Sequence, residues 1–212
     1  MDLQCESFHD AVAGKCGAVL RAIGPEIMIT RAVLRPGDGP MIRYDHTVRH
    51  PGEIRRWREY TYVDGPANQV FDGRQDTRRI LVNGEPAAAP VGSVPSYAAH
   101  LLLLEMINTG QESITFTQFD DSDPADVHSS EFRVTGSETL TTPEAAPIST
   151  TRIQLLVDGG DSNVMWCADG TVIKSDWRGA VSWATTARDQ LVEGLSPDVR
   201  TAIEQFLDRH GS

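Results

Sequence analysis

The chain has 212 residues and a formal net charge of −11, with 40% hydrophobic and 23% charged residues. This is an ordinary globular composition, without the run of about 18 apolar residues that predicts a membrane-spanning helix. The negative charge disfavours nucleic acid and anionic membrane surfaces as partners, because it would repel both. The first ten residues lack the basic and apolar segments of a signal peptide, and three cysteines without metal-binding spacing suit a reducing compartment. We therefore expect a cytoplasmic protein.

The N-terminal part of the chain predicts a helix followed by a β-meander. Apolar residues recur at three- and four-residue spacing over 6–23, which predicts an amphipathic helix that ends at Gly24 and Pro25. The next segments have the composition of strands and are separated by turns that contain Pro and Gly, which favours antiparallel pairing. These segments are residues 26–34, 41–50 and 54–63, with shorter strands expected near 69–72 and 78–83.

A second helix is expected in the middle of the chain, near 95–108. Pro95 suits its start, Gly110 suits its end, and its four consecutive leucines are apolar on every side, which predicts a buried helix. The acidic stretch 120–126 is expected to be a solvent-exposed loop. Strand-like segments then continue to residue 183, with a two-residue hairpin at the Asp-Gly pair 169–170. Residues 184–212 predict short helices.

This order of elements predicts an α+β fold in one domain, residues 1–212. Residues 1–24 form the N-terminal helix, residues 25–183 form a curled antiparallel β-sheet that encloses the central helix, and residues 184–212 form the C-terminal helices. Such a half-barrel or barrel-like cup, with its "VDG…W…DG" hairpin, resembles the LolA-like lipoprotein carriers and related bacterial families of unknown function. The resemblance implies an interior that carries an apolar ligand. A lipocalin-like or nuclear-transport-factor-like cup is the alternative.

The segment 43–63, RYDHTVRHPGEIRRWREYTYV, carries the candidate catalytic residues. A turn centred on Pro51 and Gly52 pairs His46 with Trp57, which places His46 and Glu59 about 7 Å apart on one face of the sheet. Burial raises the pKa of a carboxyl group and lowers that of histidine, so this pair suits general acid/base catalysis. Structural roles remain the alternative, in which both residues are hydrated at the rim of the sheet or Glu59 accepts a buried hydrogen bond from Tyr44.

A turn of odd length would reverse the faces of this hairpin. It would direct Arg56, Arg58, Tyr60 and Tyr62 inward and form an anion-binding surface. We rank this register second, because it buries two arginines with few partners.

Several aromatic and histidine side chains are candidates for binding a substrate. They could line the interior of the cup, although an aromatic stripe or a single histidine on an apolar helix more often belongs to a core. The candidates are Tyr44, Trp57, Tyr97, His100, Trp166 and Trp177.

The predicted function is acid/base catalysis without a cofactor or a metal. The chain has no G-x-S-x-G, P-loop, dinucleotide-binding or H-E-x-x-H motif, and His46 and His50 would lie about 13 Å apart on one strand, too far to share a metal. An isomerase, cyclase or hydro-lyase acting on a hydrophobic, polyketide- or terpenoid-like molecule fits an apolar cup with one acid and one base. The alternatives are a non-catalytic carrier of a lipid or other apolar ligand, and a regulatory interaction domain.

Overall fold

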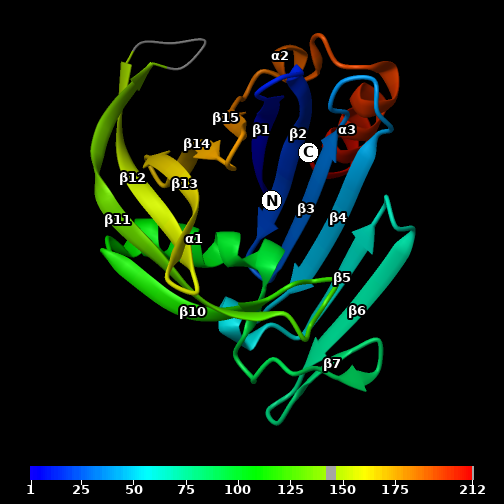
Figure 1. Cartoon of the computed structure of the whole chain (residues 1–212), viewed down its shortest axis with the longest axis vertical. Helices are drawn as coiled ribbons and strands as arrows, with labels where there is room; N and C mark the ends of the chain where they lie inside the picture. Colours follow the sequence, from blue (N-terminus) through cyan, green and yellow to red (C-terminus); the bar gives the residue numbers. More distant parts are fainter. Residues whose placement is uncertain (142–146, 212) are drawn as a thin grey trace.

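The computed structural model describes residues 1–141 and 147–211, and its strands form one large, strongly curled sheet (Figure 1). The strands are hydrogen-bonded in the order β8-β7-β6-β5-β4-β3-β2-β1-β15-β14-β13-β12-β11-β10-β9. Neighbouring strands are antiparallel, apart from the parallel pair β9 and β10. Large sheets curl because every strand is twisted in the same sense. The predicted curled, mainly antiparallel sheet is confirmed.

The strands and helices have the following bounds. The first eight strands are β1 Asp2–Asp10, β2 Gly14–Gly24, β3 Ile27–Leu34, β4 Ile42–Arg49, β5 Glu59–Asp64, β6 Gln69–Gln75, β7 Ile80–Val82 and β8 Glu85–Pro86. The remaining strands are β9 Val94–Pro95, β10 Ser113–Phe119, β11 Val127–Thr141, β12 Pro147–Val157, β13 Gly160–Ala168, β14 Thr171–Asp176 and β15 Ala180–Ala184. The helical segments are η1 Ile54–Arg56, η2 Ser96–Ala98, α1 Ala99–Thr109, α2 Arg188–Val192 and α3 Pro197–His210.

Helix α1 packs one face against the interior of the curled sheet. Figure 1 shows it within the curl, between β10 and the strands β1–β4. Leu102, Leu103 and Met106 are buried in the main core, where they join buried side chains from β4, β5, β10 and β13. Leu101 is only half-buried and Glu105 is exposed. The run of leucines predicted a helix buried on every side, but one side of α1 is partly exposed.

The opposite face of the sheet is covered at β1, β2 and β3 by the C-terminal helices. Small and apolar side chains of β2 and β3, including Leu20 and Val33, pack against Ile203 and Phe206 of α3 in a second core cluster. Arg31 of β3 also reaches α3, where its Nη1 donates to the carbonyl oxygen of Ala202 at 2.9 Å. β2 and β3 therefore lie between two layers. None of the described helices is long and apolar enough to cross a membrane.

The predicted N-terminal helix over 6–23 is wrong, because these residues form most of the β1–β2 hairpin. The turn follows Asp10, whose Oδ1 accepts hydrogen bonds from the backbone N–H groups of Val12 and Ala13, both at 2.8 Å. β2 is buried on both faces: Leu20 packs against α3 on one side, and Val19 and Arg21 are buried on the other. A strand buried on both faces loses the alternation of polar and apolar residues, so its apolar spacing also fits a helix.

The register of the β4–β5 hairpin differs from the predicted one. The segment after Pro51 and Gly52 forms the short helix η1, so β5 begins only at Glu59. His46 consequently pairs with Tyr62, and Val48 pairs with Tyr60. This arrangement turns the two tyrosines of β5 inward, while Arg56 and Arg58 stay exposed. The shift exchanges the faces of β5 relative to the predicted hairpin.

Candidate functional site

A pocket lies where the short strand β15 leaves a gap in the sheet. β15 pairs with β1 over Glu6–Asp10 and with β14 over Lys174–Asp176. Beyond Ala184 the chain leaves the sheet, and one backbone bond, from Thr185 N–H to the Cys5 carbonyl oxygen at 2.9 Å, continues the ladder. The N-terminal part of β1 and the start of β14 therefore face each other with no strand between them.

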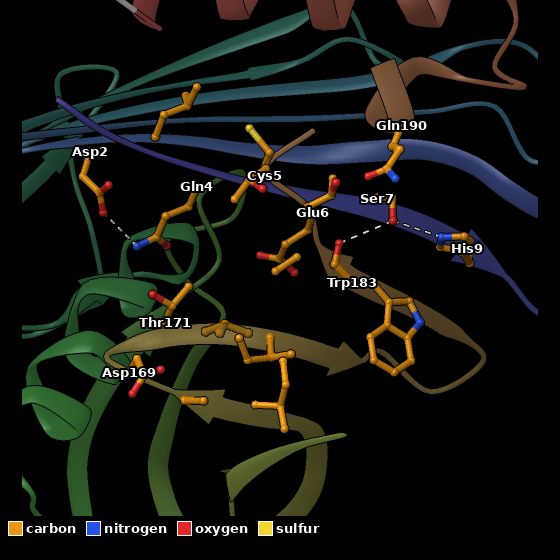
Figure 2. A pocket seen from close by; sticks show the side chains of 18 of the residues that line it. Asp2, Gln4, Cys5, Glu6, Ser7, His9, Asp169, Thr171, Trp183 and Gln190 are labelled. Atoms are coloured by element: carbon orange, nitrogen blue, oxygen red, sulfur yellow. Dashed lines mark hydrogen bonds between the residues drawn. The ribbon is translucent and has the colours of Figure 1, made fainter. Parts of the chain in front are cut away.

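This gap, which we call the wedge, holds a pocket of about 690 Å³ (Figure 2). Its wall combines residues 2–7 of β1 with Thr171, Val172 and Ile173 of β14, and the end of β15 closes the narrow side. Figure 2 shows the Glu6 side chain directed from β1 into this space and Trp183 at its far end. Both apolar and polar side chains line the wall, which suits a molecule that has both kinds of surface.

Glu6, in the wall of the wedge, belongs to a buried ion pair. Glu6 accepts hydrogen bonds from Nη1 of Arg21 on β2 and from the hydroxyl of Ser182 on β15. The side chains of Glu6 and Arg21 are only 4% and 7% exposed. Burial, together with the charge of Glu6, raises the pKa of the neighbouring Cys5 thiol to about 11. A buried pair of this kind is costly to break, because the remaining charge would have no partner.

Polar side chains extend from this ion pair as one row across the concave face of the sheet. Successive register partners are Gln4 with Arg21, Arg21 with Thr30, and Thr30 with His46. Cross-strand partners place their side chains on the same face, at neighbouring positions. The row therefore leads from the wall of the wedge to the centre of the core, at His46.

The side chains of His46 and Asp121 are in contact at the inner end of this polar row. Nε2 of His46 lies 3.0 Å from Oδ1 of Asp121, and their side chains are 0% and 1% exposed. Asp121 Oδ2 accepts hydrogen bonds from the Ser96 hydroxyl at 2.5 Å and the Tyr97 backbone N–H at 3.1 Å. Asp121 therefore connects η2, just before α1, to the loop after β10 through hydrogen bonds.

Aromatic rings surround the His46 imidazole. Its ring centroid lies 5.8 Å from that of Tyr60 and 5.7 Å from that of Tyr97, both in stacked orientation. Burial and the nearby Asp121 charge raise the pKa of both tyrosines well above the usual range. The Tyr60 ring lies directly over Gly73 of β6, where a Cβ atom would come within 2.0 Å of the ring. The imidazole therefore sits in a tightly packed interior.

Several buried polar atoms of the row have no hydrogen-bond partner among the described residues. They are Arg21 Nε, Thr30 Oγ1, both ring nitrogens of His46 and Asp121 Oδ1. The His46 and Asp121 atoms are in contact, but the ring N–H is not directed at the carboxylate oxygen. Buried polar groups nearly always have a hydrogen-bond partner, so these atoms are unusual for the interior of a protein.

The predicted catalytic pair, His46 and Glu59, is not formed. Glu59 lies on the outer face of β5, where Arg49 Nε is 3.2 Å from its Oε1, and its side chain is 53% exposed. The expected hairpin lacked η1, which inserts residues between the two strands and shifts the register. His46 is buried as predicted, but its acidic neighbour is Asp121. We predicted a solvent-exposed loop for the stretch that contains Asp121, and this was wrong at that residue.

Tyr44, Trp57 and Tyr97 belong to the aromatic interior around His46. Tyr44 and Tyr97 each lie beside Tyr62, with ring centroids 6.1 and 5.6 Å apart. Trp57 is 1% exposed and donates from Nε1 to the Ser93 carbonyl oxygen at 2.8 Å. Tyr97 stacks on His46, whereas Trp57 lies against Tyr60. None of the three residues lines the wedge.

His100, Trp166 and Trp177 lie apart from one another. His100 of α1 bonds to Gln4 at 3.0 Å, and burial together with the Arg21 charge lowers its pKa well below the usual value. A β-bulge pairs Trp166 with Lys174 rather than with the expected Ile173, and Lys174 Nζ lies over the Trp166 ring. Trp177 donates to the Ser182 hydroxyl at 3.1 Å. Neither tryptophan is among the residues that line the wedge, whereas Trp183 is.

Sequence reasoning missed Glu6, Arg21 and Asp121. Glu6 and Arg21 were placed in the expected N-terminal helix, and a helix would not make them cross-strand neighbours. An isolated arginine within the apolar stretch 18–23 is the one local signal for a buried ion pair. Within residues 1–141 and 147–211, no three His, Cys, Asp or Glu side chains are grouped closely enough to hold a metal ion.

Comparison with known proteins supports the fold alone. No protein-family model matches the chain, and no curated protein matches it. A solved structure of a "Beta-barrel-like Protein of Domain of Unknown Function DUF1849 from Brucella abortus" is similar, with a TM-score of 0.51 over 86% of this chain and 94% of that one. The two sequences are 13% identical. The chain therefore shares a β-barrel-like fold with a protein of unknown function.

Proposed function

We propose that this protein binds a small amphipathic molecule in the wedge, without transforming it. The observation that carries the proposal is the pocket of about 690 Å³ at the unpaired end of β15, because its wall joins apolar groups such as Leu3 and Val172 to polar groups such as Gln4 and Glu6. Pockets of this size and mixed lining are typical of small-molecule sites. The sequence analysis gave a non-catalytic carrier of a lipid or other apolar ligand as the alternative to catalysis, and this proposal changes the ligand to an amphipathic one.

The position of His46 favours binding over catalysis. A general base must come within hydrogen-bond distance of the proton that it removes, or reach it through one water. The imidazole is fully buried and is not among the residues that line the wedge, and Glu59 is on the outer face of the sheet. An amphipathic ligand in the wedge would contact Gln4 and Glu6, but not the histidine.

A titration with monolauroylglycerol tests the binding function. Trp183 lines the wedge, so a ligand there should change the tryptophan fluorescence, and calorimetry gives the affinity. Replacing Ala184 with tryptophan should fill the pocket and abolish binding. Val12→Trp is the matched control, because Val12 is 97% exposed in the β1–β2 turn and should leave the affinity unchanged. Equal binding by the Ala184→Trp variant and the wild type would disprove a site in the wedge.

Acid/base catalysis is a second candidate, supported by the buried contact between His46 and Asp121. Asp121 would orient the imidazole in the role first expected for Glu59, and the substrate would have to displace Tyr97 to reach the ring. The test is incorporation of solvent deuterium next to the carbonyl group of 2-decanone. Exchange that is lost in His46→Gln, at unchanged ligand affinity, would favour catalysis over carriage.

A further inference from the structure

The two sides of the wedge are edges of the sheet. β1 and β14 each pair with β15, so where β15 ends they lie about 9–10 Å apart, which is twice the spacing of neighbouring strands. Residues Asp2–Gln4 of β1 and Thr171–Ile173 of β14 have no strand pairing on the sides that face each other, whereas Cys5 is already bonded to Thr185. The missing width is that of one strand.

The backbone of β1 presents hydrogen-bonding groups to this gap. The Cys5 carbonyl oxygen accepts from Thr185, so it points toward β15. The N–H and C=O groups of alternate residues in a strand point to the same side, so those of Leu3 point into the wedge. The backbone N–H and C=O groups of Gln4 point the other way, toward its partner Arg21 on β2. A chain placed in the gap could therefore bond to Leu3 without disturbing the pairing of β1 with β2.

We infer that the amphipathic ligand of the wedge is an extended peptide of about four residues that completes the sheet by inserting between β1 and β14. This inference rests on the proposed binding function and names its ligand class. Four extended residues span about 13 Å, enough to cover the open stretch Asp2–Gln4. Strand addition of this kind gives affinity through main-chain hydrogen bonds, while alternate side chains enter pockets on the two faces.

The charges around the wedge favour a peptide with positive charge. Asp2, Asp169 and Glu193 line the pocket, and the whole chain carries a net charge of −11. Lys15 also lines it, but its Nζ donates to the carbonyl oxygen of Gln190. A basic peptide would therefore be attracted to the site and an acidic one repelled, with an effect that weakens as salt is added.

Capped tetrapeptides test the inference on the full chain by NMR titration and calorimetry. The first probe is acetyl-Lys-Val-Lys-Val-amide. The second is the same peptide with both valine nitrogens methylated, which keeps its side chains and charge but removes two main-chain donors. The third is acetyl-Glu-Val-Glu-Val-amide, and monolauroylglycerol serves as the lipid probe. We expect the first peptide to shift the Leu3 amide resonance and to bind on the order of tenfold more tightly than the second or the third.

Two variants examine the strand edge directly. Leu3→Pro removes the N–H that points into the wedge and is compatible with an unpaired strand edge, whereas Leu3→Val keeps it. The proline variant should bind the first peptide on the order of tenfold more weakly than the valine variant, at similar thermal stability. Should the proline variant unfold, the methylated peptide still tests the same hydrogen bonds on the wild-type chain.

The outcomes separate this inference from the function on which it rests. Equal affinity for the methylated and unmethylated peptides would overturn strand insertion. If monolauroylglycerol shifts the amide resonances of the wedge and the tetrapeptides do not, the inference fails and the binding function stands. If none of the probes shifts these resonances, both fail.

Discussion

His46 of β4 and Asp121, in the loop after β10, are 75 positions apart in the chain, yet their side chains approach to 3.0 Å in the centre of the core. Asp121 also holds Ser96 and the backbone of Tyr97, just before α1. One carboxylate thus connects the sheet, the helix segment and a loop. Its contribution should be to the stability of the fold around α1.

Replacing Asp121 with alanine should destabilise the protein by about 3 kcal/mol, because the Tyr97 N–H and the Ser96 hydroxyl would lose a buried acceptor. Urea unfolding measures the change. Asp126→Ala is the control: Asp126 makes an exposed pair with His128, and its loss should cost no more than about 0.5 kcal/mol. Similar losses in the two variants would contradict a structural role for Asp121.

Glu59 and His46 should be energetically independent. Glu59 pairs with Arg49 on the outer face, and His46 lies in the core. Glu59→Gln should therefore change the free energy of unfolding by less than about 0.5 kcal/mol, and a double-mutant cycle with His46→Gln should give a coupling energy near zero. A coupling above about 1 kcal/mol would instead place the two side chains in contact and restore the predicted register.

Gly73 should not tolerate a side chain. A Cβ atom there would lie 2.0 Å from the Tyr60 ring, so Gly73→Ala must displace the ring that stacks on His46. We expect a loss of about 1–3 kcal/mol or more in stability, the usual cost of overpacking. The control is Gly160→Ala, where the added Cβ atom would lie 3.5 Å from the Val157 carbonyl oxygen, an ordinary van der Waals distance. If Gly73→Ala keeps wild-type stability, the Tyr60 ring does not lie where we describe it.

Acid should destabilise the protein through His100. Burial and the Arg21 charge lower its pKa below the unfolded value, so below about pH 6.5 the unfolded chain binds more protons than the folded one. The free energy of unfolding should then fall as the pH decreases from 7.5 to 5.5. In His100→Gln this pH dependence should be weaker, by up to about 1.4 kcal/mol per pH unit.

His128 should change the free energy of unfolding with pH in the opposite direction from His100. Its hydrogen bond to Asp158, with the further contribution of Asp126, raises its pKa above the unfolded value. The protonated form therefore stabilises the fold at low pH, and this contribution is lost as the pH rises through the raised pKa. His128→Gln should lose stability mainly below pH 6.5. Parallel pH profiles for the two variants would show that neither histidine titrates as described.

The sequence predicts the parts of the fold that local chemistry determines. The strands near 26–34 and 41–50, the hairpin at Asp169 and Gly170, a helix in the middle of the chain and the C-terminal helices follow from turn residues and apolar spacing. The N-terminal hairpin could not be predicted in this way. β2 is covered on its outer face by α3, some 180 residues later in the chain, and that distant contact makes its apolar pattern ambiguous.

The candidate site depends on contacts that a single sequence does not encode locally. The inward position of His46 was predicted, but its partner depends on the register of β5, which η1 changes. The wedge depends on β15 ending at Ala184 while β1 and β14 continue. A difference in the lengths of three strands becomes a site only after they pair, and β1 lies far from β14 and β15 in the chain.

The two ends of the sheet, β8 and β9, are strands of two residues, and each contains a proline, Pro86 or Pro95. Proline lacks the N–H that a further strand would need, so short strands of this kind discourage pairing between copies of the protein. The protein should therefore resist the edge-to-edge aggregation to which open sheets are prone. Because both outer edges of the sheet are protected, the protein can keep an open strand position within the sheet without its copies associating edge to edge.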